Sequence, residues 1–187
     1  MFPWVPFDST LVFSPCIMYN HEMSLFLPII KSFNTFGVTY VAVGGIAVIL
    51  HGHSRLTTDL DFVIDLSPEN VALAMSALSS EGLICKVPIR LEDFGSEEIR
   101  HSWIKDKGMR VLGFTKSNNP LISVDIFVEY PVEFSLLYKD SANVQLGAEF
   151  IRVCSLEHLL LMKAEAGRPK DLEDLRILNL IKDRKKL

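Results

Sequence analysis

The chain has 187 residues, of which 49% are apolar and 22% are charged, and its formal net charge is −4. This length and composition are typical of a globular domain with a buried core. The negative balance argues against a generic basic nucleic-acid-binding protein, although the C-terminal segment, 163–187, is richer in Lys and Arg than in Asp and Glu.

The cysteines and the hydropathy of the sequence favour a cytoplasmic location. Cys16, Cys85 and Cys154 are odd in number and far apart, so they predict neither a disulfide framework nor a zinc site and favour a reducing cytoplasm. The longest apolar stretch, 36–50, contains glycines and is shorter than the roughly 20 residues that span a bilayer. We therefore expect a cytoplasmic protein with no membrane partner.

The N-terminal residues, 1–22, are apolar and aromatic and carry no Lys or Arg, unlike the start of a secretory signal. We expect them to form a poorly structured lead-in or an arm packed on the domain, and Met23 is an alternative start of the native chain. No repeat or linker divides the remainder, so 23–187 is predicted to be a single domain.

Along this domain, helical spacing of apolar residues alternates with short β-rich runs. Ser67-Pro68-Glu69 has the cap, proline and acid of a helix start, whereas the charged segment 92–100 is interpreted as a loop. The expected elements in chain order are a helix over 24–35, a strand over 38–43, a helix over 46–50, a strand from 59, a helix over 68–80, strands over 83–87, 110–114, 121–128 and 150–154, and helices over 155–167 and 171–182. This order predicts a mixed sheet with helices, in the α+β or α/β class.

Two carboxylates stand one residue apart at the start of the strand from 59. Alternate side chains of a strand share a face, so Asp59 and Asp61 point the same way while Leu60 and Phe62 point to the other face. Their mutual repulsion is costly unless a cation lies between them, and Mg²⁺ prefers carboxylate and phosphate oxygens. The pair therefore predicts a metal site, and two Mg²⁺ ions are able to hold both oxygens of an in-line phosphoryl displacement.

A third acid and a diglycine complete this candidate site. Asp125 lies within an apolar strand, where an isolated charge would cost several kcal/mol, so it needs a partner. If its strand lies beside the first, Asp125 joins Asp59 and Asp61. Gly44 and Gly45 end a strand and open a helix, a geometry that lets the backbone approach a triphosphate and directs N–H groups at it.

These five residues resemble the signature of the nucleotidyltransferase superfamily, the polymerase-beta-like fold. That signature is a diglycine at a helix start, then Asp-x-Asp, then one acid on a neighbouring strand. More narrowly, GGIAVILHGHSRLTTDLDF and the tail SLEHLLLMKAEAGRPKDLEDLRIL are similar to the abortive-infection and type IV toxin–antitoxin nucleotidyltransferases and their uncharacterised relatives. The resemblance extends over about 25–181.

The resemblance implies a mixed sheet flanked by helices, with C-terminal helices packed on it. It also implies transfer of a nucleoside monophosphate from an NTP such as ATP to an acceptor hydroxyl, with release of pyrophosphate. Asp59 and Asp61 would hold two Mg²⁺ ions, with Mn²⁺ as an alternative metal. Asp125 would bind the catalytic ion and help to remove the acceptor's proton, and Gly44 and Gly45 would contact the triphosphate.

Three basic residues are further candidates for nucleotide binding. Arg55 precedes the aspartates and has a fork that suits phosphate, but a solvated loop arginine is the alternative. Lys163 shares the inward stripe of its helix and must either reach solvent or meet anions; the resemblance favours phosphate. Arg168 lies at the turn after Gly167 and would reach an NTP or an RNA backbone, with a surface role as the alternative.

Other charged residues have simpler interpretations. Asp171 is expected to cap the last helix, and Asp174 to pair with Lys170 four residues earlier. His51 and His53 are not at metal-ligand spacing and are expected to be structural or to face solvent.

The acceptor stays open in the sequence. The leading hypothesis is a toxin of a toxin–antitoxin or phage-defence pair that acts on tRNA and has an antitoxin partner. The same chemistry on a small molecule such as an aminoglycoside, or on a protein hydroxyl, is an alternative. A second class is a non-catalytic binding module of the antitoxin type, but a binding-only scaffold gains nothing from three clustered carboxylates.

Overall fold

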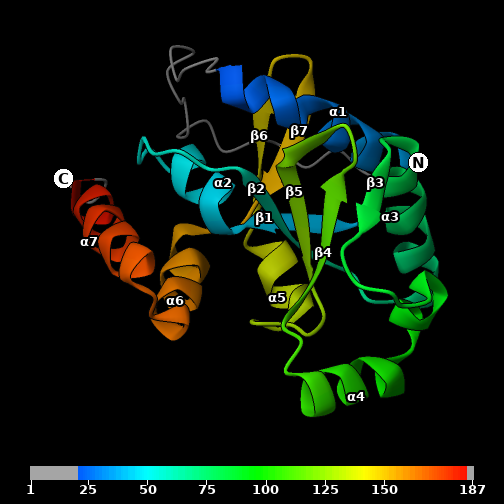
Figure 1. Ribbon diagram of the computed structural model, residues 1–187. Coiled ribbons are helices and arrows are strands. Elements are labelled where there is room, and N and C mark those ends of the chain that lie inside the picture. The colour runs from blue at the N-terminus through cyan, green and yellow to red at the C-terminus, as the bar shows by residue number, and fades with distance from the viewer. Residues whose placement is uncertain (1–20, 185–187) are drawn as a thin grey trace.

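In the computed structural model, the protein is built around one seven-stranded sheet of order β3-β4-β5-β2-β1-β7-β6 (Figure 1). The structure describes residues 21–184, so the predicted N-terminal arm, 1–22, lies almost entirely outside the described residues. β2 is parallel to β5 and β1 is parallel to β7, whereas the other neighbouring strands are antiparallel. The mixed sheet and the α+β class predicted from the sequence are thus confirmed.

The elements follow one another along the chain without a long irregular segment. They are α1 (His21–Phe36), β1 (Tyr40–Val43), α2 (Gly44–Leu50), β2 (Asp59–Ile64), α3 (Pro68–Ser80), β3 (Leu83–Cys85), the 3₁₀ helix η1 (Leu91–Gly95), α4 (Glu97–Lys107), β4 (Val111–Lys116), β5 (Asn119–Phe127), α5 (Phe134–Lys139), β6 (Ala142–Leu146), β7 (Glu149–Val153), α6 (Leu156–Ala166) and α7 (Pro169–Arg184). Within 21–184, no helix combines the length and the apolar character needed to cross a bilayer.

One predicted loop is wrong. The segment 92–100 belongs to η1 and α4, because it contains the start of α4. Ser96 Oγ accepts a hydrogen bond from the Ile99 N–H, and two glutamates lie in the first helical turn, where negative charge is stabilising. Phe94 and Trp103 are buried and their rings stack. The sequence analysis also did not predict α5 or β6, and β6 forms the edge of the sheet beside β7.

The two faces of the central strands differ in character. Phe33 of α1 packs against Tyr40 and Phe62, with ring centroids 5.4 and 4.8 Å away, and Leu60 is fully buried with them. Because side chains alternate along a strand, Asp59 and Asp61 lie on the face away from α1. The apolar face thus anchors β2 while the acids face the opposite direction.

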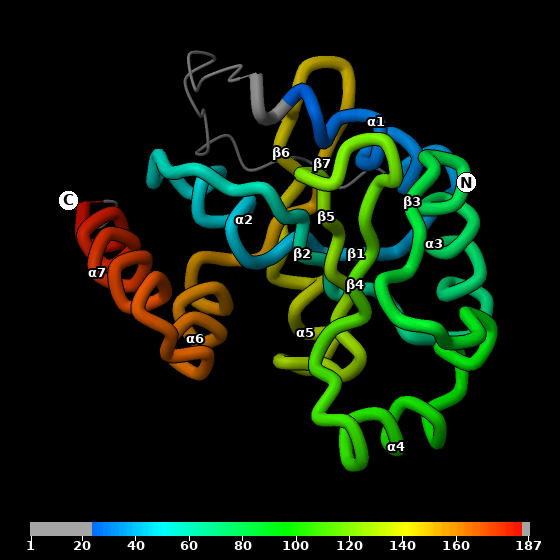
Figure 2. The backbone as a smooth tube through the Cα atoms, in the orientation of Figure 1, coloured from blue at the N-terminus to red at the C-terminus, as the bar shows by residue number. Residues whose placement is uncertain are grey.

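The C-terminal helices α6 and α7 pack on each other, and α6 contacts α2 (Figure 2). Ser155 Oγ accepts from the His158 N–H at the start of α6, and Gly167 ends this helix with φ +58°. Both ends agree with the sequence prediction. The pair of helices therefore stands next to the diglycine helix rather than over the apolar face.

Candidate active site

The diglycine fixes how closely α2 approaches β2. Gly44 has φ +61°, and a Cβ there would lie 1.9 Å from Asp61 Oδ2. The Gly45 N–H donates a hydrogen bond of 3.3 Å to the same oxygen, and a Cβ on Gly45 would lie 2.3 Å from Thr57 Oγ1. The missing side chain of Gly44 therefore makes room for the Asp61 carboxylate at the start of α2, and that of Gly45 makes room for Thr57.

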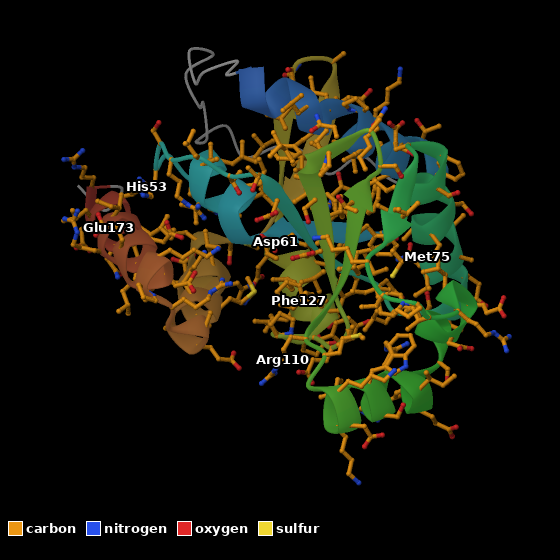
Figure 3. The ribbon with its side chains drawn as sticks, viewed as in Figure 1. His53, Asp61, Met75, Arg110, Phe127 and Glu173 are labelled. Atoms are coloured by element: carbon orange, nitrogen blue, oxygen red, sulfur yellow. The ribbon has the colours of Figure 1, made fainter. Side chains whose placement is uncertain are left out.

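The register of β2 and β5 brings the three predicted acids together. Asp59 pairs with Ser123 and Asp61 pairs with Asp125 in a parallel ladder. Paired residues of neighbouring strands point to the same face, about 4.8 Å apart at the backbone. Figure 3 shows Asp61 near the centre of the molecule, where the sheet meets α2. Asp125 is thus a direct neighbour of the Asp-x-Asp pair.

Burial and like charge shape the ionisation of these acids. Burial raises the pKa of Asp61 to about 6, the charges of Asp125 and Asp59 add to this effect, and the Gly45 N–H opposes it. Burial also raises the pKa of Asp125, while the ammonium of Lys86 lowers it. The carboxylates therefore repel one another across a partly buried surface, and a cation bound between them would relieve this repulsion.

The donor set fits a hard divalent cation, although the described side chains do not form a preassembled cage. Over residues 21–184, no three His, Cys, Asp or Glu side chains lie ready to hold a metal ion. Instead, Asp61 accepts from the Gly45 N–H, and Asp125 lies 3.9 Å from Lys86 Nζ. Carboxylate oxygens on adjacent strands, with glycine backbone beside them, suit Mg²⁺ with a phosphate co-ligand.

Lys86 is a site residue that the sequence analysis missed. Its backbone N–H donates to the Gly113 carbonyl (2.8 Å), and its Nζ donates to Ser123 Oγ (2.6 Å). Gly113 pairs with Asp125 across β4 and β5, and a Cβ at Gly113 would lie 3.0 Å from Lys86 Cδ. The absence of a side chain at Gly113 thus lets the Lys86 side chain cross β4 and reach Ser123 and Asp125 on β5.

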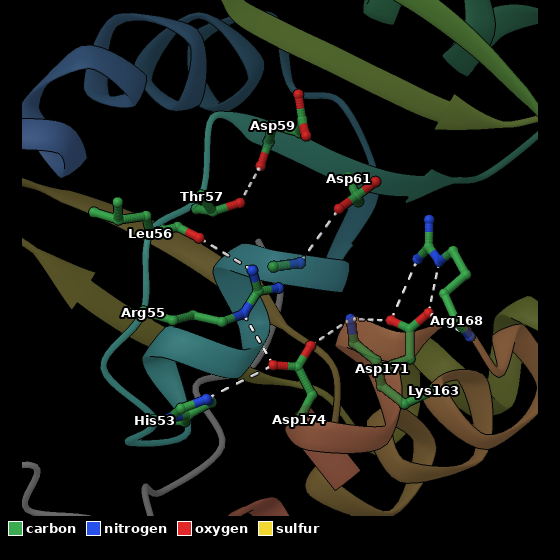
Figure 4. A network of polar contacts seen from close by, with 11 residues as sticks. His53, Arg55, Leu56, Thr57, Asp59, Asp61, Lys163, Arg168, Asp171 and Asp174 are labelled. Atoms are coloured by element: carbon green, nitrogen blue, oxygen red, sulfur yellow. Dashed lines mark hydrogen bonds and ion pairs between the residues drawn. The ribbon is translucent and has the colours of Figure 1, made fainter.

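A buried ion-pair network joins the loop after α2 to the C-terminal helices (Figure 4). Lys163 Nζ lies 2.8 Å from Asp171 Oδ1 and 2.8 Å from Asp174 Oδ2, and the three side chains are at most 5% exposed. Arg55 Nε reaches Asp174 Oδ1 at 3.0 Å, and His53 lies 3.8 Å from the same oxygen. Lys163 therefore meets anions, as its inward position required, and these anions are two aspartates of α7.

Arg168 and Asp171 pair with each other at the start of α7. α7 begins at Pro169, two residues before the predicted start, so Asp171 lies in its first turn and not at its N-cap. Asp171 Oδ2 accepts a hydrogen bond from the Arg168 N–H (3.3 Å), and Arg168 Nε lies 2.6 Å from the same oxygen. The interpretation of Asp174 as a partner of Lys170 is corrected, because Asp174 is buried and pairs with Arg55 and Lys163. The side chain of Arg168 remains 59% exposed, so it is the member of this network most accessible to a ligand.

Comparison with known proteins identifies the fold. No protein-family model and no curated protein matches the chain. Among solved structures, the lincomycin-bound lincosamide adenylyltransferase LnuA matches with a TM-score of 0.56 and 18% identity, over 86% of this chain and 96% of LnuA. ANT(2″)-Ia in complex with adenylyl-2″-tobramycin matches with a TM-score of 0.55 and 12% identity, over 85% and 88%. A putative nucleotidyltransferase from Thermotoga maritima matches with a TM-score of 0.52 and 20% identity, over 82% and 89%.

The chain has the nucleotidyltransferase fold. The fold predicted from the diglycine and the aspartates is thereby confirmed. The narrower resemblance to toxin–antitoxin members stays a prediction. Within this fold the acids occupy β2 and β5, the diglycine opens α2, and the charged network connects α6 and α7 to them.

Proposed function

We propose that the protein is a Mg²⁺-dependent nucleotidyltransferase that moves a nucleoside monophosphate from an NTP to an acceptor hydroxyl and releases pyrophosphate. The observation that carries the proposal is the pairing of Asp61 with Asp125 on adjacent strands, beside a diglycine whose first residue, Gly44, leaves room for the Asp61 carboxylate. Such a cluster destabilises the folded chain, and a metal–triphosphate ligand would offset this cost.

The acids and the diglycine have separate proposed roles. Asp59, Asp61 and Asp125 would hold the Mg²⁺ ions, and bound metal would supply charge stabilisation for the transferred phosphoryl group. Gly44 and Gly45 present backbone to the triphosphate at the start of α2. Asp125 is the candidate acceptor of the proton that leaves the attacking hydroxyl, since its side chain is 27% exposed and lies on β5, on the side away from the diglycine.

The basic residues divide into one that reaches a ligand and two that support the site. The exposed guanidinium of Arg168 is proposed to bind phosphate oxygens directly, and its fork suits a bidentate contact. Arg55 and Lys163 are both held by Asp174. Their proposed contribution to nucleotide binding is therefore to fix the loop after α2 and helix α6 and to add positive charge near Asp61.

The test is label transfer from each α-labelled NTP with Mg²⁺, with and without total tRNA, cell protein, lincomycin and tobramycin. We expect transfer to one acceptor class, loss in EDTA, and loss in Asp61→Asn and Asp125→Asn. The exposed Asp106 on α4 supplies the matched control, Asp106→Asn, which should keep full activity. Equal labelling by wild type and Asp61→Asn across the panel would overturn the proposal and favour the binding module.

The acceptor and the biological setting are finer parts of the same proposal. The resemblance to toxin–antitoxin nucleotidyltransferases supports tRNA as an acceptor and an antitoxin as a partner. The antibiotics bound by LnuA and ANT(2″)-Ia support the inclusion of small molecules in the panel. An adjacent gene for a small DNA-binding antitoxin would favour the first of these two settings.

A further inference from the structure

Lys86 borders the acid cluster on the side away from the diglycine. In the sheet, β1 and β5 flank β2 on opposite sides, and β4 and β3 continue beyond β5. Gly44 and Gly45 follow β1, whereas Lys86 follows β3 and reaches Ser123 and Asp125 on β5. The acids therefore have backbone for a triphosphate on one side and an ammonium group on the other.

The in-line geometry of nucleotidyl transfer places the leaving pyrophosphate and the acceptor on opposite sides of the acids. The acceptor oxygen forms a bond to the α-phosphorus while the bond to the pyrophosphate oxygen breaks, and pyrophosphate leaves with that electron pair. The acceptor's proton passes to a base, for which Asp125 is the candidate. Attacking and leaving oxygens lie roughly in line through the phosphorus. If pyrophosphate leaves on the side of α2, the acceptor enters on the side of Lys86.

The Lys86 ammonium is available to such an acceptor. Its side chain is 44% exposed, and one of its three N–H groups is donated to the neutral hydroxyl of Ser123. The carboxylate of Asp125 lies 3.9 Å away, beyond ordinary hydrogen-bonding distance. The charges of Lys170 and Arg168 also act on the acids from the turn between α6 and α7.

We propose that Lys86 binds the acceptor and that this acceptor carries a phosphate group close to its reacting hydroxyl. The inference rests on the proposed nucleotidyl transfer and extends it to the substrate class. An ammonium beside the attacking oxygen attracts a phosphate or phosphodiester and repels a polycation. The terminal nucleotide of an RNA and a free mononucleotide share this chemistry, whereas tobramycin does not.

The experiment compares Lys86→Met and Lys86→Arg with the control Lys105→Met, an exposed lysine of α4. Acceptors are an oligoribonucleotide with a free 3′ hydroxyl, AMP and tobramycin. We expect Lys86→Met to raise the KM for the phosphate-bearing acceptor about tenfold while the NTP KM stays unchanged, since one charge-assisted contact is lost. Lys86→Arg should keep most of the affinity. Labelling of the oligoribonucleotide but not AMP would identify RNA as the source of the phosphate.

Acceptor binding is also measured directly, by fluorescence anisotropy of the 5′-labelled oligoribonucleotide and by competition with AMP. Here too Lys86→Met should weaken binding about tenfold relative to Lys105→Met. Preferential modification of tobramycin, or equal acceptor affinity in wild type and Lys86→Met, would overturn the inference while leaving nucleotidyl transfer intact. Absence of transfer with a retained effect of Lys86 on binding would instead remove the proposed function alone.

Discussion

Replacing Gly44 by alanine tests the geometry on which the site depends. The residue has φ +61°, where an L side chain costs about 1–2 kcal/mol. The new Cβ would also lie 1.9 Å from Asp61 Oδ2, so the carboxylate or the start of α2 must shift. Overpacking of this kind costs about 1–3 kcal/mol. We expect Gly44→Ala to lower the free energy of unfolding by about 2–5 kcal/mol in total.

Gly37→Ala is the matched control for backbone strain. Gly37 has φ +71°, but nothing lies within 4 Å of its Cβ position, so only the first contribution applies. Urea unfolding of both variants measures the difference, which reports the contact with Asp61 alone. Equal losses of stability in the two variants would refute the close approach of Gly44 to Asp61. In the transfer assay, Gly44→Ala should be inactive and Gly37→Ala active.

Two further predictions concern buried charge. Lys163→Met leaves the carboxylates of Asp171 and Asp174 with one cation fewer, so it should cost about 3–5 kcal/mol in urea unfolding; a loss equal to that of Lys105→Met would contradict the network. Asp61 has a folded-state pKa of about 6 against an ordinary 3.8. The folded protein therefore binds more protons than the unfolded chain between these values, and stability should fall by roughly 2–3 kcal/mol as pH rises through this window. In EDTA, Asp61→Asn should lose this fall, and an unchanged pH profile would argue against the burial of the Asp61 charge.

Local patterns were sufficient where the physical cause is local. The start of β2 at Asp59 follows from the alternation of Asp59 to Phe62, and the bounds of α6 follow from the Ser155 cap and the glycine at 167. The segment 92–100 was misread because acids in a first helical turn look like a charged loop when the buried partners, Phe94 and Trp103, are not yet known to stack. In this segment the same charged residues are compatible with a helix start and with a loop.

In the candidate site, too, the residues with a local sequence signal were predicted and the residue that depends on long-range neighbours was missed. The Asp-x-Asp pair is visible because its spacing matches the period of a strand, and the isolated charge of Asp125 within an apolar strand pointed to a partner. Lys86 had no such signal: its reach depends on the absence of a side chain at Gly113, on a different strand. A sequence shows neither which strands become neighbours nor where a glycine opens a path between them.

The network around Asp174 shows how a correct local inference meets a long-range partner. The inward position of Lys163 required an anion, but helical spacing offered Lys170 as the partner of Asp174. Arg55, more than a hundred residues away, was interpreted as a phosphate-binding or solvated arginine and not as a partner of Asp174. Burial decides between these pairings, because a carboxylate that is 2% exposed needs buried cations, whereas a surface pair contributes little. Asp174 thereby fixes the loop that carries Arg55 onto α6 and α7. That loop leads directly into β2, so the C-terminal helices help to hold the strand of Asp59 and Asp61 in place.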